Sequence, residues 1–388
     1  MQDRILELPK VDNIYESINV FKQLYNWYSP EEWLISENLF NVSNNIAMYR
    51  PDLISVGIRL NVQVNLFLRT LKVFDSKNKF NEMGKEIGCF ALTESNAGVL
   101  SGLVVETLFE ETFNGFTLWT PNGVYKNWIS QGISAKYMLI FAKNNKNKKD
   151  IRIFLTKSDS ENIERKQINN INISKTLDLA EIKLNNLELP NSSLLDMTVS
   201  LSGLELLNGI FYGRVMIAEA VSYSILGLIN HCSKILTKDK YKDLEHHKIL
   251  KDSKYDLETL INVMEASRDK ILKKKDIYTI NTFKILSVEK SLDWYFKIYK
   301  VFTTHALNYP LNFDDIILNK VAEGDTSVLR LSLIHHDLVK KGIFSSKFSF
   351  YQLLRIWYNP KYVLKNYINL SDELIEQSYN KQLYLSKL

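Results

Sequence analysis

The sequence has little glycine and almost no cysteine. Only 14 of its 388 residues are glycine, whereas about 7% is usual. Because loops that cradle phosphate groups are usually built from glycine, a glycine-rich phosphate loop is disfavoured. The two cysteines, Cys89 and Cys232, lie far apart and outside any paired motif. A disulfide framework or a cysteine-based zinc site is therefore not expected, and a reducing compartment fits best.

The sequence also lacks segments that would direct or anchor the chain at a membrane. Residues 1–10 contain no apolar stretch of the kind found in secretory signals. No apolar run reaches the roughly 18–20 residues that a membrane-spanning helix needs. We therefore expect a cytoplasmic protein without a membrane span.

Net charge is small, at +5 from 49 basic and 44 acidic residues. The Lys and Arg residues do not gather in one stretch, which disfavours nucleic-acid binding. The 45% hydrophobic and 24% charged fractions are those of an ordinary globular protein. A mild attraction to anionic substrates or carriers is compatible with this charge.

Three regions differ in their hydrophobic patterns. Residues 1–85 have apolar residues at helical spacing, and "SPEEW" at 29–33 indicates a capped helix start. Residues 86–195 contain short β-rich runs separated by turn-forming residues such as "TPNG" and "KNNKNKKD". Residues 196–388 return to long helical patterns. The sequence therefore predicts an α+β protein with a middle β-domain between two helical domains.

Four motifs follow one another along the chain: "GCFALTE" at 88–94, "FTLWTPNGVYKNWISQGISAKYMLIFA" at 116–142, "LDLAEIKLNNLELPNSSLLD" at 177–196 and "AEGDTSVLRL" at 322–331. In this order they resemble motifs of the acyl-CoA dehydrogenase and acyl-CoA oxidase superfamily. The first and last are closest to the oxidase versions, whereas the length is similar to that of the dehydrogenases. The resemblance implies an N-terminal helical domain, a middle β-barrel or sandwich and a C-terminal four-helix bundle.

The resemblance also implies a reaction and a set of site residues. Members of the superfamily use FAD to oxidise the α,β-bond of an acyl thioester, with a carboxylate that removes the α-proton. By this resemblance Glu323 is the base. Thr93, Trp128 and Ser130 match residues that contact the flavin, and Arg214 matches an arginine near the carrier arm of the substrate.

Each of these residues also has an ordinary structural explanation. Glu323 could cap the helix that follows it, and Thr93 could be a plain strand residue. Trp128 beside a turn is typical of core packing, and Arg214 could face solvent on a helix. The functional interpretation depends on the four motifs occurring together.

The chain departs from the superfamily where relatives hold the far end of FAD. The family places a serine after a glycine to bind the pyrophosphate, whereas this chain has Gly98 followed by Val99, which cannot donate a hydrogen bond. The Arg-x-x-Phe-Gly segment that reaches the adenosine is replaced by "TKDKYKDLEHHKIL" at 237–250. A glycine-rich turn before the base is replaced by "TTHALNYP" at 303–310.

Three explanations of these departures remain open. FAD could be held by other cations, such as His246, His247, Lys240 and Lys242. A related subunit could supply the missing contacts in a heteromer. Alternatively, the protein could be a flavin-free member of the family, either a non-redox acyl-thioester enzyme or a non-catalytic partner subunit. By resemblance we expect a homodimer or homotetramer, with the apolar helices at 204–236 and 280–307 suited to the interface. The six histidines form no metal-spaced set, so no metal is expected.

Overall fold

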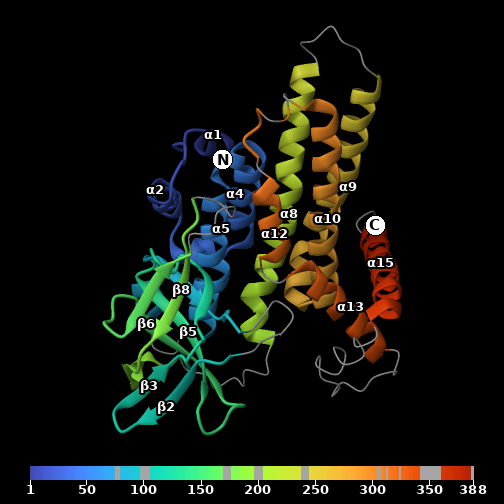
Figure 1. The fold of residues 1–388 in the computed structure, drawn as a ribbon. Coiled ribbons are helices and arrows are strands. Elements are labelled where there is room, and N and C mark those ends of the chain that lie inside the picture. Colours follow the sequence, from blue (N-terminus) through green and yellow to red (C-terminus); the bar gives the residue numbers. More distant parts are fainter. Residues whose placement is uncertain are drawn as a thin grey trace. The chain divides into compact units, whose positions relative to one another are not determined.

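Along the chain, a region of strands lies between two helical regions in the computed structural model (Figure 1). It describes residues 1–74, 79–96, 105–168, 176–195, 204–236, 244–303, 306, 308–311, 313–322, 325–340 and 360–385. The chain divides into two compact units, Met1–Gly213 and Arg214–Leu388. The mixture of helices and strands confirms the α+β class, while the division into three domains stays a prediction.

Short helices form the start of the first unit, and local capping explains where they begin. The Asn13 side chain accepts the backbone N–H of Glu16 at the start of α2. Ser29 and Glu32 form a reciprocal capping box around α3, with Pro30 in the first turn, as "SPEEW" predicted. The helices are α1 Gln2–Leu6, α2 Ile14–Tyr25, α3 Pro30–Trp33, α4 Ser36–Tyr49, α5 Ile54–Asn61, α6 Arg69–Phe74 and α7 Lys79–Met83, with a short 3₁₀ turn at Pro51–Leu53.

Between α5 and α6 the helix widens into a π-helix, η2 Val62–Leu68. Buried amides continue along this stretch, and the Asn65 side chain donates to Asn61 Oδ1 at 2.7 Å. Gly209 packs so closely here that a Cβ on it would lie 2.0 Å from the Asn65 carbonyl oxygen. The guanidinium of Arg69 lies 3.6 Å from the ring centroid of Tyr212. Because Gly209 lies so close to the Asn65 carbonyl oxygen, position 209 requires a residue without a Cβ.

Strands of the first unit form two sheets. The larger sheet has the order β1-β5-β2-β3-β9, with β6 paired to the other side of β5, and the smaller has the order β4-β8-β7. The β5–β6 pair encloses "KNNKNKKD" in its turn, as predicted. The strands are β1 Gly88–Ala91, β2 Leu108–Thr112, β3 Gly115–Trp119, β4 Lys126–Ser130, β5 Tyr137–Asn144, β6 Ile151–Lys157, β7 Ile163–Gln167, β8 Leu179–Leu184 and β9 Leu187–Pro190, followed by a 3₁₀ turn at Asn191–Ser193.

Aromatic side chains fill the core of the larger sheet. Phe109, Phe116 and Phe154 pack edge to face, with centroid distances from 5.1 to 6.0 Å. All three are buried, and such pairs add to the stabilisation from burial alone. The β-rich runs therefore form a packed layer whose inner face is apolar.

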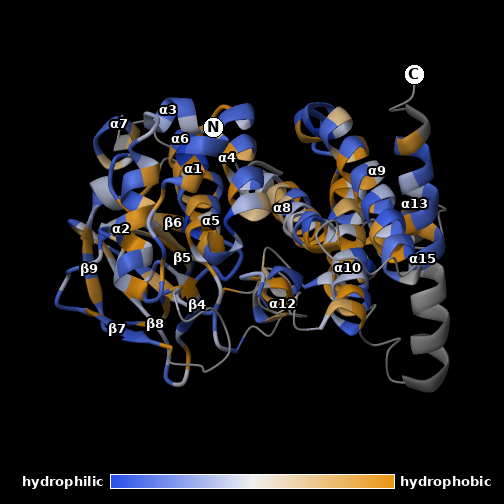
Figure 2. Ribbon diagram, turned by 90° about the horizontal axis from the view of Figure 1, so that it is seen from above, coloured by the Kyte–Doolittle hydropathy of each residue, from blue (hydrophilic) through white to orange (hydrophobic). Residues whose placement is uncertain are grey.

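Long helices make up the second unit, and α8, α9 and α10 run side by side (Figure 1). Their shared core includes Val221, Ile225, Leu257, Val288 and Phe302, all buried. In Figure 2 these helices carry hydrophobic stripes between hydrophilic ones, as expected of bundle helices. The helices are α8 Leu204–Leu236, which begins in the first unit, α9 Leu244–Lys274, α10 Ile277–Phe302, α12 Phe313–Val321, α13 Thr326–Lys340 and α15 Pro360–Leu385.

The apolar character of α8 is explained by its position inside the fold. By length and composition alone, Gly209–Leu236 could cross a membrane, but 78% of its most apolar window is buried. That is the behaviour of a core helix. Many of its apolar residues, and many of those of α10, lie in the bundle core, while the use of these helices in a subunit interface stays a prediction.

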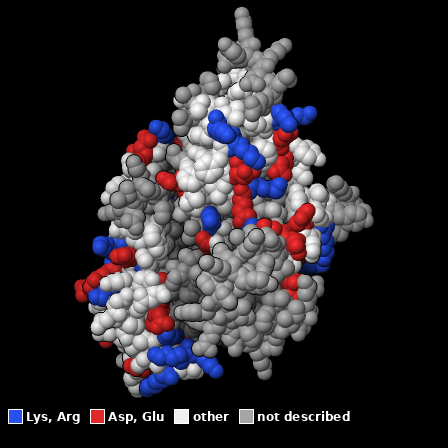
Figure 3. All heavy atoms as spheres, turned by 45° about the vertical axis from the view of Figure 1, so that its right-hand side comes forward, with Lys and Arg blue, Asp and Glu red and all other residues white. Residues whose placement is uncertain are grey.

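Charged residues at the edge of the bundle join three helices. Arg330 on α13 donates from Nε and Nη2 to Glu289 on α10, and from Nη1 to Ser371 and Asp372 on α15. Among the described residues on the face shown in Figure 3, basic and acidic side chains are interspersed and form no single basic patch. This distribution agrees with the low net charge.

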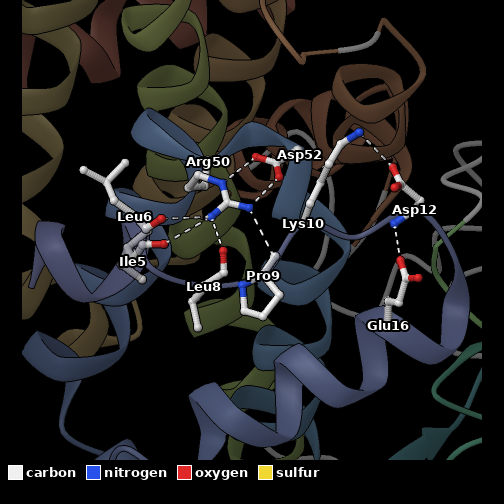
Figure 4. Close-up of polar contacts among 9 residues, drawn as sticks. All are labelled: Ile5, Leu6, Leu8, Pro9, Lys10, Asp12, Glu16, Arg50 and Asp52. Atoms are coloured by element: carbon white, nitrogen blue, oxygen red, sulfur yellow. Dashed lines mark hydrogen bonds and ion pairs between the residues drawn. The ribbon is translucent and has the colours of Figure 1, made fainter.

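Arg50 fastens the N-terminal segment to α4 (Figure 4). Its guanidinium donates to the Leu8 carbonyl at 2.6 Å and to the Pro9 carbonyl at 3.2 Å, with longer contacts to the carbonyls of Ile5 and Leu6. Asp52 accepts from Nε and Nη2 of the same group, at 2.9 and 2.7 Å. The Arg50 cation therefore binds carbonyl groups at and just beyond the end of α1. The last carbonyl groups of a helix have no hydrogen-bond partner within the helix.

Candidate cofactor site

Thr93 lies just beyond strand β1 rather than within it. The strand ends at Ala91, and the Leu92 N–H donates to the Phe90 carbonyl at 3.1 Å, which turns the chain. Thr93 is therefore not the plain strand residue that one interpretation of the sequence allowed, because this tight turn interrupts the ladder. Its consequence is that Thr93 is exposed while its neighbour Glu94 is buried.

The segment around Thr93 is bonded to the start of β4. The Asn127 N–H donates to the Thr93 carbonyl, and the Ser95 N–H donates to the Tyr125 carbonyl, both at 2.9 Å. Between these bonds, Glu94 and Lys126 face each other as an isolated antiparallel bridge. Two segments that are distant in the sequence therefore meet at one corner of the β region, which we call the Thr93–Trp128 corner.

Trp128 is exposed at this corner because β4 contains a bulge. Its pairing with β8 shifts register between Lys126 and Ile129, and Trp128 has a φ of 59°. Val124 and Lys126 point inward, so simple alternation would bury Trp128 as well. The bulge changes the alternation and leaves the indole 42% exposed. Trp128 is therefore not a core residue, and its left-handed backbone conformation is unfavourable for a bulky side chain.

Ser130 ends the same strand, two residues after Trp128. It pairs with Leu179 of β8 and is half-buried. The next residue, Gln131, also has a positive φ, of 63°, and its buried amide donates to the Gly88 carbonyl at 2.9 Å. The end of β4 is thereby fastened to the start of β1, on which the turn to Thr93 depends.

A buried ion pair supports the turn that follows β4. Arg59 on α5 lies 2.5 Å from Asp178 Oδ1, and both side chains are fully buried. Asp178 Oδ2 accepts the Ser134 N–H at 2.9 Å, and Arg59 Nε donates to Ser17 Oγ at 3.0 Å. Burial lowers the pKa of Arg59, although the attraction of Asp178 opposes that shift. This pair joins the N-terminal helices to the smaller sheet.

A second buried ion pair lies inside the Thr93–Trp128 corner. Lys126 Nζ lies 2.6 Å from Glu94 Oε1, and neither side chain is exposed. Burial lowers the pKa of Lys126 to about 8, against the attraction of Glu94. Burial would raise the pKa of Glu94, but Lys126 and hydrogen bonds from Thr107 outweigh it and lower that pKa. Only a weak feature of the sequence indicates this pair, namely a lysine at an inward position of a strand.

Arg214 belongs to the second unit, where it contacts α10. It is half-buried, and its Nη1 donates to Asn281 Oδ1 at 2.9 Å. Three residues further along α10, the fully buried Lys284 donates to the carbonyl of Ala322, the residue before Glu323. Arg214 is therefore not the solvent-facing residue that one interpretation of the sequence allowed.

Several predicted positions lie outside the described residues. These are the predicted base Glu323, the altered pyrophosphate segment at Gly98 and Val99, and the cations Lys240 and Lys242. His246 is described, and it packs edge-on against Phe302 at 5.1 Å. Within the described part of the chain, no three His, Cys, Asp or Glu side chains are grouped to hold a metal ion. Of the predicted site residues, the structure brings together Thr93, Trp128 and Ser130.

Comparisons with known proteins identify the fold. No protein-family model matches the sequence, and no curated protein matches it. Among solved structures, PigA with FAD and proline has a TM-score of 0.71 at 15% identity, covering 88% of this chain and 92% of that one. Butyryl-CoA dehydrogenase from Megasphaera elsdenii has a TM-score of 0.69 at 16% identity, with coverage of 82% and 90%. The prolyl acyl carrier protein oxidase AnaB has a TM-score of 0.65 at 15% identity, also with coverage of 82% and 90%.

These similarities extend over most of both chains, although few residues are identical. They bear on architecture and not on the identity of a substrate. The chain therefore has the acyl-CoA dehydrogenase fold, as its four sequence motifs predicted.

Proposed function

We propose that the protein is an FAD-dependent enzyme that oxidises the α,β-bond of an acyl thioester. The observation that supports this most directly is Trp128, a large aromatic residue held exposed in a left-handed conformation beside Thr93. Strained backbone of this kind costs about 1–3 kcal/mol and is concentrated at ligand sites. The residues present at this corner fit the ring end of a flavin.

The proposed chemistry divides between two carbon atoms of the substrate. A base takes the proton from the α-carbon, and a hydride leaves the β-carbon, so that a C=C bond forms. A flavin bound at the Thr93–Trp128 corner would supply the acceptor for that hydride. The hydroxyl groups of Thr93 and Ser130 would bind the edges of its ring, and the Trp128 indole would pack against it. By the sequence motif, Glu323 would be the base.

The names of the matched structures support a proposal for the substrate class. The matched structures include a butyryl-CoA dehydrogenase, a glutaryl-CoA dehydrogenase with glutaryl-CoA, and a prolyl acyl carrier protein oxidase. All of these names refer to acyl groups on a thioester carrier. We therefore propose an acyl-CoA or an acyl-carrier protein as substrate, and a homodimer or homotetramer as the working form.

A second candidate is a flavin-free relative. The supporting observation is the sequence, in which Val99 replaces the pyrophosphate-binding serine and no glycine occurs at 303–310. Such a protein would be a non-redox acyl-thioester enzyme or a non-catalytic subunit paired with a related chain. The two candidates differ in a single property, the capacity to bind flavin.

An absorption spectrum of the purified protein, before and after addition of FAD, distinguishes the two candidates. Bound oxidised flavin absorbs at roughly 450 nm, and Trp128→Ala should weaken this binding. Phe113→Ala is the matched control, because Phe113 is a fully exposed aromatic residue of the β2–β3 turn. Failure of the wild type to bind FAD would exclude the flavoenzyme.

Loss of absorbance on addition of an acyl thioester then tests the chemistry. Glu323→Gln should retain FAD but slow this loss by about 10²–10⁴-fold, the usual contribution of a general base. An unchanged rate would exclude Glu323 as the base while leaving the flavin assignment intact.

A further inference from the structure

The proposed reaction makes no use of Lys126, yet this residue is fully enclosed in the β region. Its ammonium group donates to Glu94 Oε1 at 2.6 Å and to the Phe141 carbonyl at 2.7 Å. Phe141 lies on β5, in the larger sheet, whereas Lys126 begins β4, in the smaller sheet. Lys126 therefore connects both sheets to the segment that contains Thr93.

Glu94 collects further donors from a third segment. Its Oε1 accepts the Thr107 hydroxyl at 2.6 Å and the Thr107 N–H at 3.0 Å, and its Oε2 accepts the Glu106 N–H. These residues lie just before β2. The Lys126–Glu94 pair thus fixes three stretches of backbone, at 93–95, 106–107 and 125–127, relative to β5.

Stability alone is a poor explanation for this arrangement. Replacing a buried ion pair by apolar residues of similar volume is often neutral or stabilising, because desolvation of the charges offsets their attraction. A pair that satisfies so many directional donors instead specifies one register. The exposed residues that depend on this register are Thr93, one residue before Glu94, and Trp128, two residues after Lys126.

We propose that the Lys126–Glu94 pair is the positioning device of the cofactor site, which fixes Thr93 and Trp128 in the geometry that binds the flavin ring. This inference rests on the proposed function. Because the sequence lacks the serine that grips the pyrophosphate in relatives, the ring end must provide a larger share of the affinity. The affinity for flavin then depends more strongly on the precise placement of the ring-binding residues than it would in a chain that also binds the pyrophosphate through this serine.

The test compares Lys126→Met, Glu94→Gln and the double variant Lys126→Met/Glu94→Gln. Each single variant leaves a buried charge without its partner and lowers stability, whereas the double variant removes both charges and recovers it. A purely structural pair predicts that flavin binding recovers together with stability. A positioning pair predicts that the double variant is stable but still binds flavin about tenfold or more weakly, as is typical when supporting residues of a site are lost.

A comparison of FAD with FMN shows which end of the cofactor site is affected in the double variant. Dissociation constants for FAD and FMN should rise by the same factor in the double variant, because both molecules have the same ring. A rise for FAD alone would place the defect at the adenosine end and overturn the proposal. Dissociation constants for both flavins that are the same in the double variant as in the wild type would overturn the proposal as well.

A readout without flavin separates this inference from the proposed function. Fluorine NMR of protein labelled with fluorotryptophan reports the 6 tryptophans, and Trp128→Phe identifies the Trp128 resonance. We expect that resonance to shift or broaden in the double variant, even if the wild type binds no flavin. A resonance at the wild-type position would overturn the positioning role.

Arg59→Met is the matched control, since it breaks the other fully buried ion pair of the same unit. Arg59 bonds to Ser17, Ser134 and Asp178, outside the Thr93–Trp128 corner. It should lower stability while leaving the Trp128 resonance and the flavin constants unchanged. Equal effects of Arg59→Met on these signals would mean that any destabilisation suffices, and would overturn the proposal.

Discussion

The two units of the chain hold their charged side chains in different ways. In the first unit, Lys126–Glu94 and Arg59–Asp178 are ion pairs with no exposed surface, and each joins separate segments or elements. In the second unit, Arg330 is 13% exposed, and its partners Glu289 and Asp372 are 40% and 55% exposed. The interior of the bundle is mainly an apolar cluster that includes Leu257 and Val288, although Glu219, paired with Arg268 at 2.8 Å, is also fully buried in this unit.

The two units differ in their buried ion pairs because different contacts fix the relative positions of their segments. Helices of a bundle are aligned mainly by interlocking apolar stripes, so their alignment depends less on buried charges. The irregular segments beside β4 make few hydrogen bonds of the β-ladder type. Their positions are fixed instead by directional hydrogen bonds and ion pairs of buried side chains. We therefore expect mutations of ion pairs to have large effects in the first unit and small effects in the second.

The largest effect is expected for Lys126→Met. It leaves the Glu94 carboxylate buried without its cation, and breaking a buried pair in this way costs about 3–5 kcal/mol. The free energy of unfolding from urea titration measures this loss. A loss below about 1 kcal/mol would show that the pair behaves as an exposed one does.

The next largest effect concerns pH. The folded protein releases the Lys126 proton near pH 8, whereas the ordinary pKa of lysine in the unfolded chain is 10.5. Between these values the unfolded chain binds more protons, so this residue makes the free energy of unfolding rise with pH, by up to about 3 kcal/mol. The wild type should therefore gain stability relative to Lys126→Met between about pH 8 and pH 10. A difference that stays constant or falls would contradict the lowered pKa of Lys126.

A smaller effect is expected for Arg330→Met. The variant removes contacts to Glu289, Ser371 and Asp372, but these acids can be hydrated once the cation is lost. We expect a loss of about 1.5–3 kcal/mol, the range for hydrogen bonds to charged groups. Thermal unfolding with increasing salt provides the check, since an edge network should weaken as salt screens it. A loss as large as that of Lys126→Met would remove the contrast between the units.

The smallest effect is expected for Lys297→Ala. Lys297 pairs with Asp293 four residues earlier on α10 at 2.6 Å, and both side chains are more than half exposed. Exposed pairs at this spacing contribute about 0.3–0.5 kcal/mol. Differential scanning calorimetry of the variant should show an almost unchanged unfolding temperature. Asp293→Ala should behave alike, and a large shift in either would indicate a further contact of that side chain.

The sequence predicted those parts of the fold that depend on local rules. Ser29 and Pro30 mark a helix start because capping involves residues only a few positions apart. The turn at 145–150 follows in the same way from its composition. The overall fold was predictable because four motifs occur in the order of a known family.

The geometry of the candidate site was harder to predict from the sequence than the fold. Thr93 and Trp128 were identified by resemblance, but alternation along β4 favours a buried Trp128. The bulge that exposes it depends on pairing with β8, which no local pattern shows. Glu94 and Lys126 are 32 residues apart, so only the three-dimensional structure reveals their contact. The π-helix at Val62–Leu68 is likewise compatible with an ordinary helical pattern.

The clamp at Arg50 has a consequence for how this protein can vary. Arg50 binds Ile5, Leu6, Leu8 and Pro9 through their carbonyl oxygens, which every amino acid possesses. As far as the clamp is concerned, exchanges in that segment should be tolerated, whereas exchange of the single guanidinium should not. A library randomised at Leu6, which is 48% exposed, should thus retain folded members, while one randomised at Arg50 should be strongly depleted.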